Sequence, residues 1–480
     1  MWRVDTGLSR PLKGAAGFML AVAVLVGGTV YGAADEKIVP QSREELNLSY
    51  APVVKHVSPA VVNVYARRVV AQRAMPFDDP LFREFFGGMG GFPPRQRVQQ
   101  SLGSGVILDS SGLILTNNHV VAGMTAVRVS LADQREFDVD VVLTDPISDL
   151  AVLRIRTKGQ TFPTLSLGDA DSLEVGDLVL AVGNPFGLGQ TVTQGILSAV
   201  RRVQIKEGEE RVYLQTDAAI NQGNSGGALV NMKGELVGIN TAIFSRSGGS
   251  DGIGFAIPSS IVRLVLDAAR RGDKLVRKPW LGARLQAVTP EIAESLHRDR
   301  PIGALVSDVS RESPAAKGGL EPGDLVVAID GMPVDDPADL TYHFITRPPG
   351  STVHMRVIRN GSETELSVVA ATAPETVPRD ETVLGGNGPL AGAKVANLSP
   401  AVADELGMEM PSGGGVVIVE ADDATIASRI GFLKRDRIVS VNGTPIDNVA
   451  TLVRASDQQN HVWKITIDRG GQRMTQIFQF

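Results

Sequence analysis

The sequence predicts a mainly β protein in which an all-β sandwich or barrel is followed by two copies of a smaller domain. Short runs rich in Val, Ile, Leu and Thr, separated by Gly, Asn, Asp and Pro, continue from Val53 to about Ile261, and this spacing is typical of sandwiches and barrels. Beyond Pro279 the pattern changes and then repeats itself. A chain of 480 residues is too long for one core, so about three domains are expected.

Composition limits the classes of function. The chain is 43% hydrophobic and 21% charged, as in soluble globular proteins. Its net charge is -6 and it has no long basic run, so nucleic acid is not an expected partner. Cysteine is absent, which excludes disulfides, thiolate zinc sites and a cysteine nucleophile. Because the sequence has no cluster of metal ligands either, we expect no metal and no other cofactor.

The first 34 residues have the order of an export signal. Basic residues precede a mostly apolar stretch from Gly14 to Ala34, which ends in small residues before Asp35. Residues 1–34 are therefore expected to be cleaved off. The alternative is an uncleaved anchor, because the stretch approaches the roughly 20 residues that span a bilayer. In both cases the rest of the chain is exported.

The first large domain is expected over residues 50–272. A helix from Ser259 should close it, with Gly272 as the stop. The segment from Ala71 to Gln100 interrupts the strands and carries Phe77, Leu81, Phe82, Phe85 and Phe86 among clustered Gly and Pro, so it is too long and too apolar for an ordinary connection. We interpret it as a mobile loop that packs elsewhere, or alternatively as a local satellite core.

The smaller domain occurs twice, over residues 279–371 and 388–480. Asp324 matches Asp436, and four other pairs of residues keep the same offset. The segment between the copies, Ala371–Gly388, contains Pro and acidic residues and is interpreted as a linker.

The stretch "GNSGGAL", Gly223 to Leu229, contains a candidate serine nucleophile, Ser225. Such a serine needs a base, and His119 in "TNNHVV" is the candidate. The acid that orients the base is expected to be Asp149, because it opens the apolar run "DLAVLRI" and would stand at the mouth of a buried strand. The alternative is Asp145, a turn former beside Pro146.

A serine nucleophile also needs donors for the developing oxyanion. Gly223 lets the backbone turn so that its own N–H and that of Ser225 point at one spot, with Asn224 between them. The order His119, Asp149, Ser225 is that of chymotrypsin-like double β-barrels.

Six motifs together resemble the HtrA/Deg family of serine proteases: "TNNHVV", "SDLAVLRI", "GNPFGLGQTVTQGI", "TDAAINQGNSGGALVN", "GELVGINTAI" and "GIGFAIPS". The resemblance implies a chymotrypsin-like protease domain followed by two PDZ domains of α+β type. It implies a periplasmic protease that degrades, and can also hold, misfolded envelope proteins, and that forms homotrimers and larger cages without metal or ATP. By this resemblance the catalytic residues are His119, Asp149 and Ser225, the oxyanion loop is Gly223 to Ser225, and the regulatory loops are Ala71–Gln100, Arg201–Arg211 and Phe244–Gly252.

In PDZ domains a short loop before a strand captures the carboxylate of a peptide's C-terminus, and the peptide adds as a strand. "WLGA" matches this loop in the first copy, and "LAGA", Leu390 to Ala393, is its counterpart in the second. Arg435 replaces the glycine found at Gly323 in the first copy, which would strain a turn that needs a positive φ; the second domain is therefore expected to bind peptides more weakly or to serve assembly. The expected peptide-binding residues of the first copy are Trp280, Leu281, Gly282 and Ala283.

Specificity should depend on the position six residues before the nucleophile, where an aspartate would select Lys or Arg. Here it is Ala219, so small or medium aliphatic residues should be preferred at the cleaved bond. The alternative is that Asp217 reaches the pocket and favours basic residues. By resemblance, the other wall is the strand that contains Ile239, Asn240, Thr241, Ala242 and Ile243.

Two other functions compete with that of an active endopeptidase. A scaffold or chaperone with a silent protease site would have no need of the intact triad and the oxyanion glycine. An esterase would share the nucleophile but would have little use for domains that bind peptide ends. The expected partners are therefore unfolded or misfolded envelope proteins and their C-terminal peptides.

Overall fold

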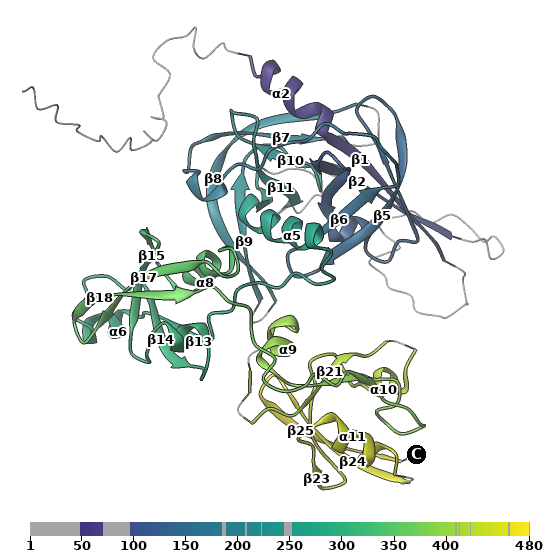
Figure 1. Ribbon diagram of the computed structural model, residues 1–480, viewed down its shortest axis with the longest axis vertical. Coiled ribbons are helices and arrows are strands. Elements are labelled where there is room, and N and C mark those ends of the chain that lie inside the picture. The colour runs from purple at the N-terminus through teal and green to yellow at the C-terminus, as the bar shows by residue number, and fades with distance from the viewer. Residues whose placement is uncertain are drawn as a thin grey trace, which may run out of the picture. The chain divides into compact units, whose positions relative to one another are not determined.

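The computed structural model in Figure 1 describes residues 49–70, 97–184, 189–206, 209–221, 223–243, 252–408, 410–411, 413–422, 424–458 and 461–479. The expected signal, residues 1–34, lies outside these ranges, as do most of the expected loops Ala71–Gln100 and Phe244–Gly252. None of the helices in the described ranges is long and apolar enough to cross a membrane.

The first six strands close into an antiparallel barrel: β1 (Val61–Val70), β2 (Arg97–Asp109), β3 (Leu113–Asn117), β4 (Ala126–Ser130), β5 (Glu136–Asp145) and β6 (Leu150–Ile155). Their order around the barrel is β1-β2-β3-β6-β5-β4. All five residues of β3 are buried, whereas β4 buries alternate residues, as a strand with one face on a core does. Arg97 to Gln100, expected in a loop, belong to β2, because their backbones pair in register with β1.

A second closed barrel follows: β7 (Leu178–Gly183), β8 (Thr191–Lys206), β9 (Glu209–Thr216), β10 (Ala228–Val230), β11 (Leu236–Ile243) and β12 (Gly254–Pro258). Its order is β10-β11-β12-β9-β8-β7. The expected regulatory loop Arg201–Arg211 is mostly strand, since β8 and β9 pair as far as Lys206 opposite Glu209.

In the described residues of this domain the helices are α2 (Ala51–Val57), η1 (Ser58–Ala60), α4 (Asn118–Val121), η2 (Ala170–Ser172) and α5 (Ser259–Arg271). The helix predicted from Ser259 is confirmed as α5, and Gly272, with φ +79°, ends it in the left-handed conformation. Figure 1 shows α5 beside the barrels, and its apolar residues contact strands of both, β5 and β6 as well as β11 and β12.

The first small domain is a sheet of order β13-β14-β15-β17-β18, with β16 paired to β15. Its buried apolar residues form a core of their own, in which Phe344 is the largest fully buried side chain. Its elements are β13 (Ala283–Ala287), α6 (Pro290–Ser295), β14 (Ala304–Val309), α7 (Pro314–Lys317), β15 (Leu325–Ile329), β16 (Met332–Pro333), α8 (Pro337–Ile345), β17 (Thr352–Arg359) and β18 (Ser362–Val369).

The second small domain repeats this element order and adds one strand at the front. Its sheet runs β19-β20-β21-β22-β24-β25, with β23 paired to β22. Its elements are β19 (Thr382–Val383), β20 (Lys394–Asn397), α9 (Pro400–Glu405), β21 (Val416–Glu420), α10 (Ile426–Arg429), β22 (Arg437–Val441), β23 (Thr444–Pro445), α11 (Val449–Ser456), β24 (Val462–Arg469) and β25 (Gln472–Gln479).

The repeat extends to an ion pair between a partly exposed arginine and a buried aspartate. In the first copy the guanidinium of Arg359 donates twice to Asp324, over 2.7 Å each, and in the second Arg469 donates twice to Asp436, over 2.6 Å each. The sequence matched these two aspartates, and both carboxylates are almost fully buried. Arg435 has φ +78°, so the turn at this position does need the positive φ that the sequence analysis expected to strain it.

The segment Ala371–Gly388 was expected to be a linker, but its second half belongs to the second small domain. Thr382 and Val383 form β19, which pairs with β20, and Leu384 lies in the core of the second small domain.

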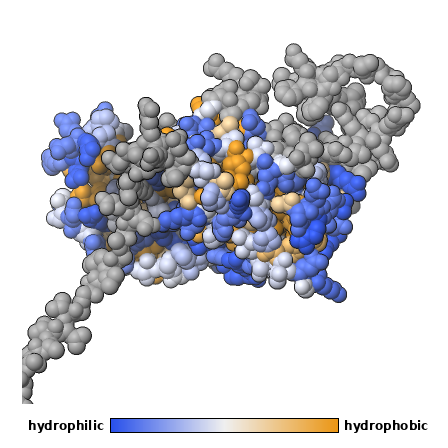
Figure 2. Space-filling view, turned by 90° about the horizontal axis from the view of Figure 1, so that it is seen from above, coloured by the Kyte–Doolittle hydropathy of each residue, from blue (hydrophilic) through white to orange (hydrophobic). Residues whose placement is uncertain are grey.

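On the face seen in Figure 2, hydrophilic residues form most of the coloured surface and hydrophobic residues occur between them in small groups.

Candidate active site

His119 and Asp149 face each other at one end of the first barrel. β3 ends at Asn117 and the chain turns into the short helix α4, whose second residue is His119. The backbone carbonyl of Asp149 accepts hydrogen bonds from the N–H of Asn118, over 2.9 Å, and from the side chain of Asn117, over 3.0 Å. These bonds hold the histidine turn against the start of β6.

The carboxylate of Asp149 orients the imidazole. Its Oδ1 accepts from the backbone N–H of His119 over 3.0 Å, and its Oδ2 lies 2.7 Å from Nδ1 of the His119 ring. When Nδ1 carries the proton of a neutral histidine, Nε2 is the acceptor. The pair therefore presents a base, and half of the His119 side chain is exposed to receive a proton from outside.

Asp149 stays ionised in this position. Burial alone raises its pKa, but hydrogen bonds from the His119 ring, from the His119 N–H and from the hydroxyl of Thr241, together with the charge of His119, hold the pKa below its ordinary value. The Thr241 hydroxyl donates to Oδ2 over 3.0 Å. The sequence predicted Thr241 in the substrate pocket and gave no sign of this contact, which joins β11 of the second barrel to the carboxylate.

Asp145, the alternative acid, is engaged in its own turn. It accepts from the Ser148 hydroxyl over 2.6 Å and from the Ile147 N–H over 3.1 Å. The structure thus brings Asp149, and not Asp145, to the His119 ring.

Ser225 lies on the second barrel, just before β10. Its hydroxyl donates to the backbone carbonyl of Thr241 over 3.0 Å, and no hydrogen bond joins it to His119 in the described part of the chain. A rotation of the Ser225 side chain is needed before Nε2 can accept its proton, and such looseness is common in sites without substrate.

The glycines around Ser225 are required by close packing against both barrels. A Cβ on Gly226 would lie 2.1 Å from the carbonyl oxygen of Ser104, and one on Gly227 would lie 2.4 Å from that of Val182. Gly223 has φ +100°, which the sequence analysis expected for the turn of an oxyanion loop. The N–H groups of Gly223 and Ser225 have no acceptor among the described residues, whereas the N–H of Asn224 donates to the Asn221 carbonyl over 3.0 Å.

Ser104, on β2, forms hydrogen bonds with the loop that contains Gly223 and Ser225. The sequence did not identify it as a residue of the site. Its hydroxyl donates to the carbonyl of Gly223 over 2.7 Å and accepts from the N–H of Asn184 over 2.8 Å. Its backbone N–H donates to the carbonyl of Ser225 over 2.8 Å. The residue is fully buried, so one side chain of the first barrel fixes two peptide groups around the serine of the second.

Removing the Ser104 hydroxyl should slow catalysis as well as weaken the fold. In Ser104→Ala the Gly223 carbonyl and the Asn184 N–H lose their partner, which costs about 1–3 kcal/mol. Because the loop around Ser225 then loses a support, kcat should fall roughly tenfold to a hundredfold. Thr116→Val is the matched control, because the buried Thr116 hydroxyl donates to the Ser104 carbonyl over 2.7 Å but touches neither Gly223 nor Asn184. We would measure kcat, KM and the melting temperature of both. Equal losses of kcat at equal melting temperatures would contradict a positioning role for Ser104.

The expected specificity residues are only partly open to solvent. Ala219 is half-buried, and its carbonyl accepts from the Thr193 hydroxyl over 2.8 Å. Ile239 is fully buried, and the side chain of the buried Asn240 donates to the Ala228 carbonyl over 3.0 Å. The side chains of Ala242 and Ile243 lie outside what the structure describes.

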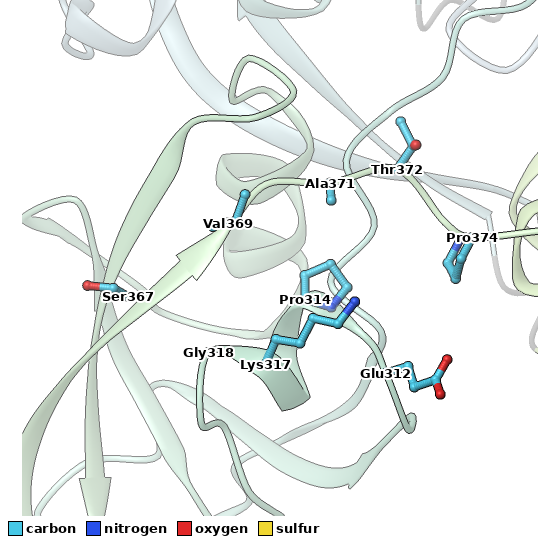
Figure 3. A pocket seen from close by; sticks show the side chains of 9 residues that line it. All are labelled: Glu312, Pro314, Lys317, Gly318, Ser367, Val369, Ala371, Thr372 and Pro374. Atoms are coloured by element: carbon cyan, nitrogen blue, oxygen red, sulfur yellow. The ribbon is translucent and has the colours of Figure 1, made fainter.

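A pocket of about 300 Å³ lies away from these residues, in the first small domain (Figure 3). It is lined by α7, by the end of β18 and by the segment from Ala371 to Pro374. It contains none of the expected site residues, so volume alone does not identify the site. The expected peptide loop does not line the pocket, although it contacts α7: Gly282 has φ +73°, and the carbonyl of Leu281 accepts from the Ala315 N–H over 3.0 Å.

Comparison with known proteins identifies two parts of the chain. Residues 103–239 match the family model for a trypsin-like peptidase domain, and residues 279–369 match that for a PDZ domain. A protein of Ectopseudomonas mendocina named "Probable periplasmic serine endoprotease DegP-like" is 39% identical over 427 residues, which cover 85% of this chain and 88% of that protein.

Two further likenesses are of the same kind. "Periplasmic serine endoprotease DegP" of Salmonella typhimurium is 36% identical over 456 residues, with coverage of 90% of this chain and 92% of its own. The solved structure "HtrA-type protease AlgW with decapeptide" is 45% identical and covers 68% of this chain and 99% of its own, with a TM-score of 0.49. On the identity and coverage of the two curated sequence relatives, the chain belongs to the HtrA/DegP-like family of periplasmic serine endoproteases, with a trypsin-like peptidase domain followed by a PDZ domain.

Proposed function

We propose that the protein hydrolyses peptide bonds with Ser225 as nucleophile, His119 as general base and Asp149 as the residue that holds His119. The observation that carries this assignment is the 2.7 Å contact between Asp149 Oδ2 and His119 Nδ1, at the junction with the loop of Ser225. Nε2 of His119 takes the Ser225 proton as Oγ attacks the carbonyl carbon. The resulting oxyanion is bound by the N–H groups of Gly223 and Ser225.

The same groups complete the reaction. His119 gives its proton to the departing amine, so that an ester with Ser225 remains and the C-terminal part of the substrate leaves. Water then attacks the ester with His119 again as base, which returns Ser225 and releases the N-terminal part as an acid. Asp149 remains a carboxylate throughout, consistent with its lowered pKa.

We propose residues 50–272 as the protease domain, and residues 279–371 and 388–480 as two PDZ domains. The matched element order of the two small domains and their equivalent Asp–Arg pairs support the second assignment. In the first, a peptide would end at Trp280–Ala283 and add to β13. Its substrates would be unfolded or misfolded periplasmic proteins.

We further propose that residues 1–34 are a cleaved signal and that the mature chain forms homotrimers able to assemble into larger cages. Mass spectrometry of the secreted chain and gel filtration of the purified protein would test these two points. A mature N-terminus other than Asp35, or a monomer at working concentration, would contradict them.

The cut sites on an unfolded substrate should follow small or medium aliphatic residues, Val, Ala and Ile. Ala219 provides no charge at the base of the expected pocket, and the carboxylate of Asp217 accepts from the Ile196 N–H over 2.7 Å, so it is engaged with β8. The preference should be graded, because one methylene of misfit is worth about 1–3 kcal/mol. Mass spectrometry of the fragments measures it. Cuts mainly after Lys or Arg would overturn the pocket assignment, and Asp217→Asn would show whether that carboxylate is the cause.

A further inference from the structure

The two small domains differ at the edge of their sheets. In the first, β13 pairs with β14 on one side, and no described strand pairs with its other side. In the second, the corresponding strand β20 carries β19 on that side, with Thr382 opposite Val395 and Val383 opposite Lys394. PDZ domains bind peptides by adding an antiparallel strand at such an edge. The extra strand of the second domain therefore lies where a peptide would lie.

Its hydrogen bonds continue into the expected carboxylate loop. The N–H of Leu384 donates to the carbonyl of Ala393 over 2.9 Å, and the carbonyl of Leu384 accepts from the N–H of Gly392 over 2.8 Å. Gly392 has φ +84°, as Gly282 of the first domain has φ +73°. An N–H of the loop that would receive the terminal carboxylate of a peptide thus binds the carbonyl of this chain.

The side chains alternate as those of a bound strand do. Leu384 is only 3% exposed and belongs to the apolar core, together with Leu390 and with Val449 and Leu452 of α11. Val383, the residue before it, is 63% exposed. Because α11 packs beside β20 as α8 packs beside β13, Leu384 fills the position that the last side chain of a peptide would occupy.

Charged residues hold the other end of the segment. Glu381 forms an ion pair with Lys394 over 2.8 Å, and the hydrogen bond from Lys394, working against burial, holds the pKa of Glu381 below its ordinary value. Arg379 donates to both carboxylate oxygens of Glu405, over 2.7 and 2.8 Å, and its carbonyl accepts from the Asn397 N–H over 2.8 Å. The segment therefore lies along the whole of β20.

We propose that Glu381–Leu384 is an internal ligand which fills the peptide groove of the second small domain. This inference rests on the proposed identity of that domain as a PDZ domain. The groove would take a C-terminal peptide of the same chemistry, with an aliphatic last residue after a short extended segment, once the internal segment has left. Because the internal ligand is covalently tethered, it competes at a high effective concentration. The apparent affinity for a free peptide equals the affinity of the open groove multiplied by the fraction of molecules in which the groove is open.

The test uses the full-length chain in a Ser225→Ala background, so that the probe is not cleaved. The probe is a photoreactive peptide that ends in Glu-Thr-Val-Leu with a free carboxylate, and labelled residues are mapped by mass spectrometry. The unmodified groove should show little labelling at residues 390–397. Leu384→Glu should raise it by roughly 10–100-fold, and Val383→Glu, which adds the same charge at an exposed neighbour, should leave it unchanged. Labelling at residues 280–287 of the first domain serves as the internal standard.

A second measurement covers the case in which Leu384→Glu unfolds the domain. The chain has no cysteine, so Val383→Cys with Lys394→Cys introduces one pair of thiols on facing residues, both at least partly exposed. This pair should oxidise to a disulfide, whereas Val383→Cys with Lys434→Cys should not. Strong labelling of residues 390–397 without any substitution, or failure of the facing pair to oxidise, would overturn the internal ligand. If the disulfide forms but the peptide labels residues 390–397 in none of the variants, the proposal that this groove binds peptides would be wrong. Cleavage by the chain with Ser225 intact tests the protease separately.

Discussion

Replacing Ser225 by alanine should abolish peptide-bond hydrolysis and leave the fold and the binding of unfolded protein in place. The change removes one oxygen, whose only hydrogen bond among the described residues is to the Thr241 carbonyl, so the loss of folding free energy should be about 1 kcal/mol. The loss of kcat should be roughly a million-fold, the scale seen when a serine nucleophile is removed from an otherwise intact site. Hydrolysis of a fluorescent unfolded protein measures the effect.

Ser172→Ala is the matched control for this experiment. The Ser172 hydroxyl also donates to one backbone carbonyl, that of Asp169, over 2.8 Å, but it belongs to η2 and contacts none of the proposed catalytic residues. It should retain full activity and a similar melting temperature. Hydrolysis by Ser225→Ala at a rate close to that of the wild type would contradict the assignment of Ser225 as the nucleophile.

Asp149→Asn should lower kcat by roughly ten-thousand-fold with the chain still folded. An amide in place of the carboxylate can donate to Nδ1 and so favour the tautomer whose Nε2 carries the proton, which leaves His119 unable to accept the proton of Ser225. Asp145→Asn is the control, because that carboxylate bonds Ser148 and Ile147 and not the imidazole. A loss of this size in Asp145→Asn, with Asp149→Asn active, would reverse the choice of acid.

The pKa of Asp149 also predicts a pH dependence of stability. A carboxyl group whose pKa is lowered on folding stabilises the folded state at pH values above its unfolded pKa, and this contribution is lost as the pH falls through the folded pKa. For Asp149 the contribution should be complete above about pH 4 and decline below it. Denaturation of the wild type and of Asp149→Asn at several pH values should therefore differ most at neutral pH and converge in acid.

Much of the fold followed from local patterns. The strand runs, the helix α5 with its glycine stop and the repeated domain were all predicted, because alternation, helical spacing and a constant offset are properties of neighbouring residues. The contact of Asp149 with His119 was predicted because Asp149 opens the apolar run "DLAVLRI" at the mouth of a buried strand. Ser104 could not be predicted as a support of the loop, since its bonds to Gly223 and Asn184 join residues 119 and 80 positions away.

The segment Glu381–Leu384 was misread for a different reason. A strand of two residues is too short to produce a periodic pattern, and the neighbouring Pro and acidic residues resemble those of a linker. Its order comes from what it meets in space, the edge of β20, the Gly392 N–H and the apolar space around Leu384. A sequence comparison of the two small domains begins after this segment, so the repeat could not reveal it.

The division of the proposed catalytic groups between the barrels has a consequence for a chain that is still being made. His119 and Asp149 belong to the first barrel and Ser225 and Thr241 to the second, and the hydroxyl of Thr241 reaches Asp149 only when both barrels have folded and met. On the proposed assignment of the catalytic groups, a chain that has folded only one barrel has no assembled hydrolytic centre. A newly made copy should therefore be unable to cleave other chains until both of its barrels have folded and met.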